Sequence, residues 1–247
     1  MSIERQSRSR SVLLGICVRL GVLTSVATLL AFGARWWWPL ELLSHFRVQY
    51  LWLLAPTSVG LLVAKRYPPA LLVGCCLLWN LALVGSDYSC PSTTAKHSAR
   101  LRLMSANVHT GNRDYERFRR TVRSEDPDVL LVMEIDDGWL AELSELRDDY
   151  PHGEAAPRGD NFGIGLFSKV PVESLQVTFL GGAGVPSIQA ALKVGDGTIN
   201  LVGTHPLPPV GRNSRLRNEQ LTAAADLAAG MKGPVIIAGD LNVTPWS

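Results

Sequence analysis

Cysteine is scarce in this 247-residue sequence, which has 4 of them. Cys17, Cys75 and Cys76 lie within apolar runs, and Cys90 follows the last of those runs with no obvious intrachain partner. Disulfide-rich domains and structural zinc sites need cysteines at short, regular spacings, so this pattern predicts neither. The pattern leaves open whether Cys90 pairs between chains. The sequence also has no internal repeat, which excludes a solenoid.

The chain also has no strong net charge. Its overall net charge of +2 is the sum of a basic first part and an acidic second part. Residues 1–100 carry 10 Lys or Arg against 3 Asp or Glu, and residues 101–247 carry 14 against 19. General nucleic-acid binders usually carry a basic face that displaces counterions from phosphates. The acidic second part, with a net charge of −5, therefore favours a partner other than nucleic acid.

The first part of the chain holds three long apolar stretches, at about 11–33, 48–64 and 69–86. Each is near the length of about 17–25 residues that a membrane-spanning helix needs. The first stretch follows basic residues, as a signal peptide does, but it exceeds the usual apolar region of about 7–15 residues. We therefore expect it to be retained, and residues 1–90 to form a membrane domain with three transmembrane helices.

The basic residues between these stretches predict the orientation, because short cytoplasmic loops carry more Lys and Arg. This rule places the N-terminus in the cytoplasm and residues after 87 outside, as a multi-pass protein of the cell membrane. A polar linker is expected at 91–100, followed by an extracytoplasmic domain at 101–247. The residues assigned to the inside are Arg5, Arg8, Arg10, Lys65 and Arg66, and those assigned to the outside are Arg35 and Arg47.

The second part alternates between strand and helix patterns, which favours an α/β (α+β) fold built as a layered sandwich. Amphipathic periodicity predicts helices at 112–126, 137–150 and 214–230. His152 is expected in a loop. The predicted strands are 101–109, 128–135, 162–169, 172–180, the two arms of a hairpin within 188–205, and 234–238.

Four of these strands end in polar residues that suit phosphate chemistry: Asn107, Glu134, His205, and the pair Asp240 and Asn242. Each alone has a structural explanation, such as a turn cap, a helix-dipole contact or an Asx turn. Together they could hold a hard cation through oxygens, contact phosphate and orient a water. That combination is typical of phosphate-ester hydrolysis, with the metal offsetting charge in the transition state.

The segments SANVHTGN, DVLLVMEID, GIGLFSK, GTHPLPPVG and VIIAGDLNVTPWS, between about 105 and 247, occur in the order of a known family. The chain resembles the endonuclease/exonuclease/phosphatase (DNase I-like) superfamily of metal-dependent hydrolases. It is most similar to bacterial membrane-anchored members with three N-terminal transmembrane helices. The resemblance implies a four-layer α/β sandwich with two facing sheets.

The resemblance also implies roles for the strand-end residues. Glu134 would be the principal ligand of Mg²⁺, with Mn²⁺ as the alternative ion, and Asn107 would lie beside it at the metal. His205 would contact the scissile phosphate, Asp240 would position the attacking water, and Asn242 would bind phosphate.

Four further residues are weaker candidates for the site. Asp160 and Asn161 precede a matching strand, and Asn161 is expected to bind substrate. Asn112 and Arg217 are candidates for the edge of the site, although the helical pattern around Arg217 favours a position on the helix surface.

The sequence departs from the family at its C-terminal end. Members of the family continue with another strand pair and an Asp-His dyad, which has no counterpart before Ser247. We therefore expect a C-terminally incomplete domain with an open sheet edge and with weak activity or none.

The function that these observations favour is a membrane-anchored, metal-dependent phosphoesterase acting outside the cytoplasmic membrane. It would cleave a phosphodiester or a phosphomonoester, and the lipid bilayer and a lipid-linked phosphate are the expected partners. The alternatives are a non-catalytic, membrane-tethered binding module that keeps the fold, and an extracytoplasmic nuclease. The substrate and the oligomeric state stay open.

Overall fold

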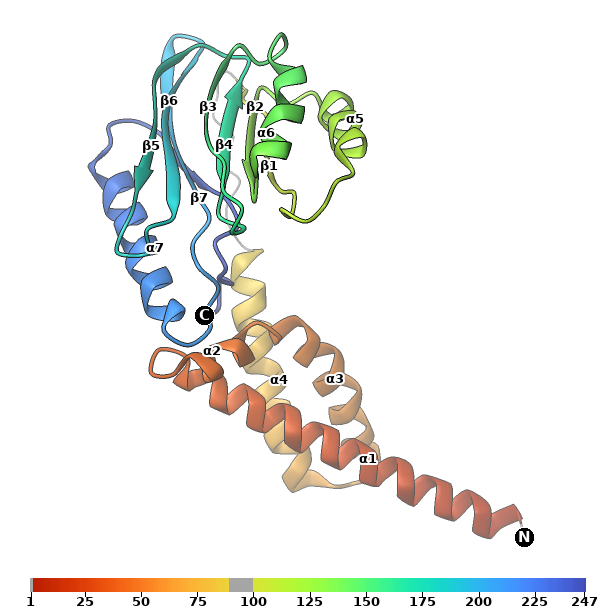
Figure 1. The fold of residues 1–247 in the computed structure, drawn as a ribbon. Coiled ribbons are helices and arrows are strands. Elements are labelled where there is room, and N and C mark those ends of the chain that lie inside the picture. Colours follow the sequence, from red (N-terminus) through yellow and green to blue (C-terminus); the bar gives the residue numbers. More distant parts are fainter. Residues whose placement is uncertain (1, 89–99) are drawn as a thin grey trace. The chain divides into compact units, whose positions relative to one another are not determined.

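The computed structural model describes residues 2–88 and 100–247 (Figure 1). The chain divides into two compact units, one with the N-terminal helices and one with both sheets. Cys90 and residues 91–99 of the predicted linker lie outside the described residues.

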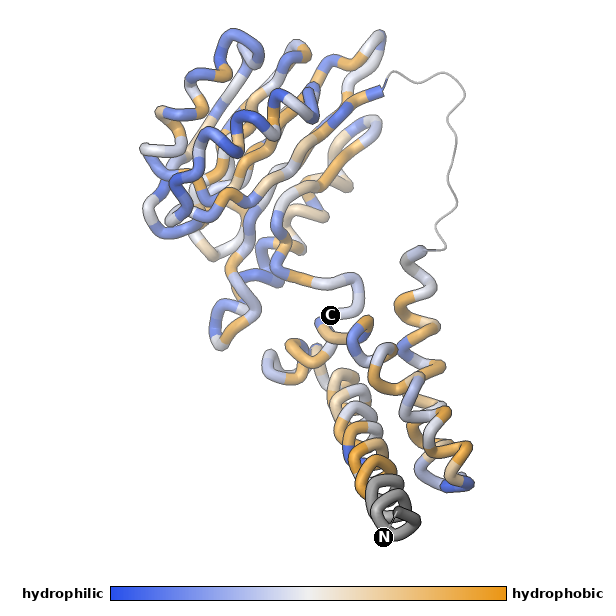
Figure 2. Tube along the Cα trace, turned by 90° about the vertical axis from the view of Figure 1, so that its right-hand side faces the viewer, coloured by the Kyte–Doolittle hydropathy of each residue, from blue (hydrophilic) through white to orange (hydrophobic). Residues whose placement is uncertain are grey.

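Helices make up the N-terminal unit, and Figure 2 shows apolar residues along most of their length. Large apolar side chains such as Trp52, Val63 and Leu71 are more than two-thirds exposed, as expected for helix faces that meet lipid rather than water. The helices are α1 (Ser2–Leu30), continued by the 3₁₀ turn η1 (Ala31–Gly33), then α2 (Trp38–Ser44), α3 (Arg47–Val63) and α4 (Tyr67–Asp87).

Two helices are long and apolar enough to cross a membrane, over Val12–Gly33 and Tyr67–Ser86. They coincide with the first and third predicted spans. The second predicted span, 48–64, falls on α3, which has 17 residues. Helices α2 and α3 are bent by 61° relative to each other. Together they are long and apolar enough for a further span, but only if the bent pair is treated as a single helix. The number of spans is therefore two or three by length and composition.

A buried polar contact joins three of these helices. Asn80 on α4 is fully buried and accepts a hydrogen bond from Arg47 Nη1 on α3 at 3.1 Å. Its amide nitrogen donates to Thr28 Oγ1 on α1 at 3.0 Å. Bonds between buried polar side chains such as these fix how neighbouring helices face each other.

The second unit contains two four-stranded sheets with mixed strand directions (Figure 1). In the first sheet β1 runs parallel to β2, and in the second β7 runs parallel to β8, while the other neighbours are antiparallel. The first sheet has the order β1 (Leu103–Asn107), β2 (Val129–Met133), β4 (Ile164–Ser168), β3 (His152–Ala156). The second has the order β5 (Val172–Phe179), β6 (Pro186–Val194), β7 (Gly197–Thr204), β8 (Val235–Ala238).

Strand β2 is buried on both faces, which explains why its sequence is an uninterrupted apolar run. Leu131 packs between the sheets against residues such as Ile188 and Leu201. Leu130 and Val132 point the other way, toward helices α5 (Tyr115–Glu125) and α6 (Asp137–Leu143). On the second sheet, Val202 packs against Ala224 of α7 (Asn213–Gly230).

Three predictions for this unit need correction. His152 lies in strand β3, not in a loop; the sequence HGEAA lacks an apolar run, and only pairing with β4 reveals the strand. The α-helical part of predicted helix 137–150 ends at Leu143, and a 3₁₀ turn (η2, Ser144–Leu146) follows. Predicted helix 112–126 begins at Tyr115, because the side chain of Asp114 caps it by accepting from Arg117 N.

Candidate functional site

Strand register brings the predicted site residues to one end of the sheets. Asn107 lies opposite Met133 in the parallel pair β1–β2, so Asn107 and Glu134 emerge at the same edge. Gly203 lies opposite Ala238 in the parallel pair β7–β8, and the segments that follow carry His205 and Asp240. The two sheets pack face to face, which places these four residues in one cluster.

The amide of Asn107 connects the two carboxylates of this cluster. Its Nδ2 atom donates to Glu134 Oε1 at 2.7 Å and to Asp240 Oδ2 at 3.2 Å. Glu134 and Asp240, which follow Asn107 by 27 and 133 positions in the sequence, thus meet at the Asn107 side chain. A pair of carboxylates held this close by one neutral donor is suited to share a positive charge.

Glu134 ends β2 with a left-handed backbone, at φ 63°, which a non-glycine residue rarely adopts. Its N–H donates to Gly163 O at 2.7 Å, and its carbonyl accepts from Thr110 Oγ1 at 2.9 Å. The side chain is 14% exposed. These contacts hold the carboxylate at the edge of the core, in a conformation that costs about 1–2 kcal/mol and is typical of functional positions.

Asp240 and Asn242 form the Asx turn that their spacing allows, since Asn242 N donates to Asp240 Oδ1 at 3.2 Å. The Asn242 side chain is also engaged: Nδ2 donates to Pro206 O at 2.9 Å. This bond ties the Asp240 loop to the segment after His205. One of the two N–H donors of the Asn242 amide is therefore used by Pro206 O in this structure.

Arg217 is buried, with 2% exposure, so the expected position on the helix surface is wrong. Its Nη1 atom donates to the main-chain carbonyl of Asn242 at 2.9 Å. The face of α7 that carries Arg217 is turned toward the loop that contains Asn242, more than 20 residues further along the chain. Helical periodicity predicts a buried face from its apolar residues, so it assigned the charged Arg217 to the surface.

His205 is 4% exposed, and its Nε2 lies 3.9 Å from Asp240 Oδ2. Its Nδ1 atom is buried and has no hydrogen-bond partner among the described residues. Burial lowers the pKa of the imidazole, and the carboxylates of Asp240 and Glu134 oppose part of that effect. The ring is therefore neutral near pH 7 and can donate one hydrogen bond to a phosphoryl oxygen.

Asn161 lies in the exposed loop before β4, at φ 68°. Its neighbour Phe162 packs against the His205 ring with a centroid distance of 5.4 Å, so this loop borders the cluster. Asp160 pairs instead with Arg158, whose Nε lies 2.9 Å from Oδ1, and that bond lowers the pKa of the Asp160 carboxyl.

Asn112 is occupied within its own loop. Its Nδ2 atom donates to Val108 O at 3.1 Å, and its Oδ1 accepts from Asp114 N at 3.0 Å. These bonds shape the connection between β1 and α5. The structure does not bring Asn112 into contact with Glu134 or Asp240.

His109 is a residue of the cluster that the sequence analysis did not select. Its Nδ1 atom lies 3.3 Å from Glu134 Oε2, and Thr110 N approaches the same oxygen at 3.4 Å. Both residues belong to the segment SANVHTGN, directly after Asn107. The sequence signal that could have identified His109 is its position two residues after Asn107.

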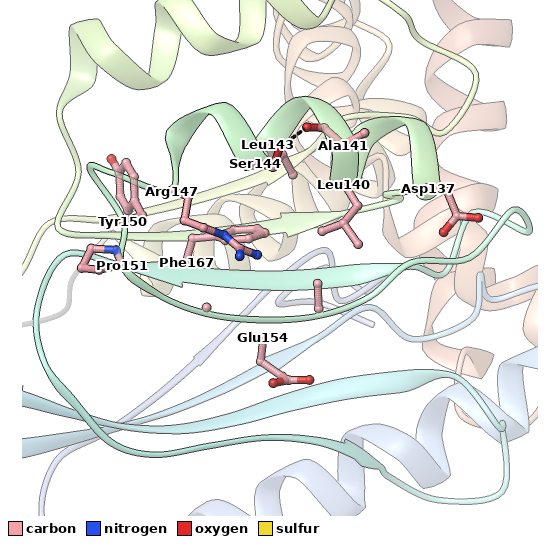
Figure 3. A pocket seen from close by; sticks show the side chains of 12 residues that line it. Asp137, Leu140, Ala141, Leu143, Ser144, Arg147, Tyr150, Pro151, Glu154 and Phe167 are labelled. Carbon is pink, nitrogen blue, oxygen red and sulfur yellow. Dashed lines mark hydrogen bonds between the residues drawn. The ribbon is translucent and has the colours of Figure 1, made fainter.

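A large cavity of the second unit lies away from this cluster. It has a volume of about 640 Å³ and lies on the helical side of the first sheet, with Leu140 and Phe167 among its lining residues (Figure 3). A smaller cavity of about 270 Å³ lies beside Asn107, between β1 and α5. We place the functional site at the strand ends, because the convergent carboxylates, amide and imidazole are there.

Within the described ranges, no group of three or more His, Cys, Asp and Glu side chains is arranged to hold a metal ion. Mg²⁺ needs no such group, since one or two carboxylates with waters and substrate phosphate satisfy it. Glu134 supplies one such carboxylate, and Asp240 lies beside it across the Asn107 amide. Asn107 turns its nitrogen to the carboxylates, so its amide would have to flip to offer an oxygen to the ion.

Comparison with known proteins gives one family. The model described as "Endonuclease/Exonuclease/phosphatase family" matches residues 104–247, which is more than half of the chain. No curated protein matches the sequence.

Solved structures share the fold of the second unit. A humanized D. rerio TDP2 carrying 14 mutations has a TM-score of 0.52 at 18% identity, covering 60% of this chain and 64% of that one. A beta hairpin deletion mutant of beta toxin from Staphylococcus aureus has a TM-score of 0.50 at 21% identity, covering 60% and 70%. D. rerio TDP2 complexed with a single strand DNA product has a TM-score of 0.52 at 17% identity, covering 58% and 61%. The chain thus spans less than two thirds of the length of these two TDP2 structures, and the likeness at these identities concerns the fold alone.

Proposed function

The chain belongs to the Endonuclease/Exonuclease/phosphatase family, and from that membership and the two apolar helices long enough to cross a membrane we propose that it is a membrane-anchored, metal-dependent phosphoesterase. The observation that carries the proposal is the cluster at the strand ends. Asn107 bridges Glu134 and Asp240 within hydrogen-bond distance, and buried His205 lies next to Asp240. Family membership supplies the reaction class, phosphate-ester hydrolysis, and the cluster supplies suitable groups.

In this proposal Glu134 holds the metal, Mg²⁺ or Mn²⁺, together with Asn107. When bound, the ion would neutralise charge on the phosphate. Asp240 would orient the attacking water and take its proton while the water oxygen bonds to phosphorus. The bond between phosphorus and the leaving oxygen breaks, and that oxygen takes a proton from solvent and leaves as an alcohol. Neutral His205 donates a hydrogen bond to a phosphoryl oxygen, where negative charge grows in the transition state.

Asn242 and Asn161 complete the proposed substrate contacts. For Asn242, one N–H of Nδ2 donates to Pro206 O, and the other N–H is the donor that would contact phosphate. Asn161 is exposed beside Phe162, whose ring contacts His205, which supports a place for Asn161 at the rim of the site.

We also propose the architecture that the family implies. Helices α5 and α6, the two sheets, and α7 pack in that order, which supports a four-layer α/β sandwich over residues 101–247. Residues 1–90 would form the membrane domain with three spans, of which the bent pair α2–α3 would be the second in chain order. The excess of basic residues in the inside loops supports an extracytoplasmic catalytic domain.

The substrate class we propose is a lipid-linked or small phosphate ester. Residues 101–247 carry a net charge of −5, which disfavours long polyanions. A membrane anchor keeps the site close to lipid headgroups. One solved relative, D. rerio TDP2, was captured with a single strand DNA product, so DNA is the competing substrate to test.

The test uses the full chain in lipid vesicles with Mg²⁺ or Mn²⁺ present. Three substrates are compared at equal phosphate concentration: a phospholipid diester, a soluble phosphomonoester and a single-stranded DNA oligonucleotide. Asp240→Asn serves as the blank. We expect slow hydrolysis that prefers the lipid and vanishes in the blank. Preferred cleavage of DNA would overturn the substrate class, and metal-dependent binding without turnover of any substrate would identify a binding module instead.

A further inference from the structure

The imidazole of His109 lies against the carboxylate that we propose as the principal metal ligand. Nδ1 of His109 is 3.3 Å from Glu134 Oε2. The His109 side chain is 70% exposed while that of Glu134 is 14% exposed, so the ring covers the carboxylate from the solvent side. An ion held at this oxygen would have the His109 nitrogen within reach.

Both residues adopt left-handed backbone conformations, at φ 61° for His109 and φ 63° for Glu134. Two non-glycine residues rarely do so at one contact, and each conformation costs about 1–2 kcal/mol. The surrounding bonds enforce it, since His109 N donates to Asn107 Oδ1 at 3.0 Å and His109 O accepts from Asn112 N at 2.8 Å. Strain that is held in place in this way is typical of functional sites.

The loop also leaves room for the ring. A Cβ atom placed on Gly111 would lie 3.2 Å from His109 Nε2, tighter than nine in ten such contacts. A larger residue at this position would therefore make the ring shift by a few tenths of an ångström, whereas glycine leaves it in place beside Glu134.

The distance between the two atoms suits a shared ion. Ligands at about 2.1–2.2 Å from an octahedral metal lie about 3 Å apart when they are neighbours. The separation of 3.3 Å between Nδ1 and Oε2 is close to that spacing. Imidazole nitrogen suits transition metals, whereas Mg²⁺ prefers oxygen ligands.

We propose that His109 is a second protein ligand beside Glu134 and that it makes the site select a transition metal ion such as Mn²⁺ over Mg²⁺. The inference rests on the proposed function, because it assumes the metal at Glu134. The simpler alternative is a hydrogen bond that only positions the carboxylate. Such a bond would affect both ions alike, which separates the two interpretations.

The experiment measures ion binding by the full chain in detergent micelles, without any substrate. Mn²⁺ binding is followed by electron paramagnetic resonance, Mg²⁺ binding by competition, and imidazole coordination by nitrogen hyperfine coupling to Mn²⁺. The test variant is His109→Asn, since asparagine tolerates a left-handed backbone. His109→Gly is the second variant if the first does not fold. The matched control is His152→Ala, because His152 pairs with Ser168 at the opposite end of the same sheet.

We expect His109→Asn to weaken Mn²⁺ binding by about tenfold or more, to leave Mg²⁺ binding within about twofold, and to abolish the nitrogen coupling. The control should match the unmodified chain in all three. Equal weakening of both ions, or nitrogen coupling that persists, overturns the role of His109 as a ligand. Mn²⁺ binding that Glu134→Gln leaves intact overturns the metal site of the proposed function itself, which is a separate result.

Discussion

Nη1 of Arg217 donates to the main-chain oxygen of Asn242 at 2.9 Å, which joins helix α7 to the loop that carries Asp240. Asn242 in turn holds the Asp240 side chain, since the Asn242 N–H donates to Asp240 Oδ1 at 3.2 Å. One turn along α7, the buried Gln220 donates to Thr204 Oγ1 at 2.9 Å, directly before His205 in the sequence. Helix α7 therefore supports both segments of the second sheet that reach the cluster.

This relationship predicts that Arg217→Ala lowers stability and activity together. Removing a buried charged donor leaves the Asn242 carbonyl without its partner, which typically costs about 1–3 kcal/mol. Thermal unfolding of the full chain and the hydrolysis rate are the measurements. Arg215→Ala is the control on the same helix, because Arg215 is 79% exposed and pairs with Glu219 on the surface. Equal effects of the two variants would contradict the support that we assign to Arg217.

Asp240→Asn should abolish hydrolysis while the metal still binds. Asparagine keeps the shape of the side chain but cannot accept the proton of the attacking water, and a general base contributes about 10²–10⁴-fold to rate. Single-turnover hydrolysis and Mn²⁺ binding are measured on the same sample. If the variant keeps most of its rate, Asp240 is not the base.

The burial of His205 predicts a loss of stability in mild acid. Its pKa in the folded protein lies below the ordinary value, so the unfolded state takes up the proton first as pH falls. The contribution of His205 is therefore present above the ordinary pKa of about 6.5 and is lost as pH falls through the lowered folded pKa. Unfolding temperatures across this range should fall less steeply for His205→Gln. An equal slope in both proteins would contradict the prediction.

If the N-terminal helices span a membrane, the full chain should stay in membranes after an alkaline carbonate wash, which removes peripheral proteins. The described helices include two that are long and apolar enough to span a bilayer. The distribution of the chain between pellet and supernatant is the measurement. Complete release into the supernatant would exclude helices α1 and α4 as membrane spans.

Sequence reasoning found the strand ends because apolar runs such as 129–133 are buried on both faces and stop at a polar residue. It missed β3, whose sequence HGEAA is defined as a strand only by its pairing with β4. It misplaced Arg217, since the loop that buries this side chain lies more than 20 residues further on. It passed over His109, because only the fold brings residues 109 and 134 to within 3.3 Å.

The cluster around Glu134 is proposed to hydrolyse phosphate esters with the help of a divalent ion. We would test this role by measuring the hydrolysis rate of bis(p-nitrophenyl) phosphate by the full chain as Mn²⁺ is titrated, in comparison with Glu134→Gln. We expect a slow rate that rises to saturation with Mn²⁺ and disappears in Glu134→Gln, while the unfolding temperature in the absence of metal stays close to that of the unmodified chain. A rate that is independent of the metal, or unchanged in Glu134→Gln, would contradict the account.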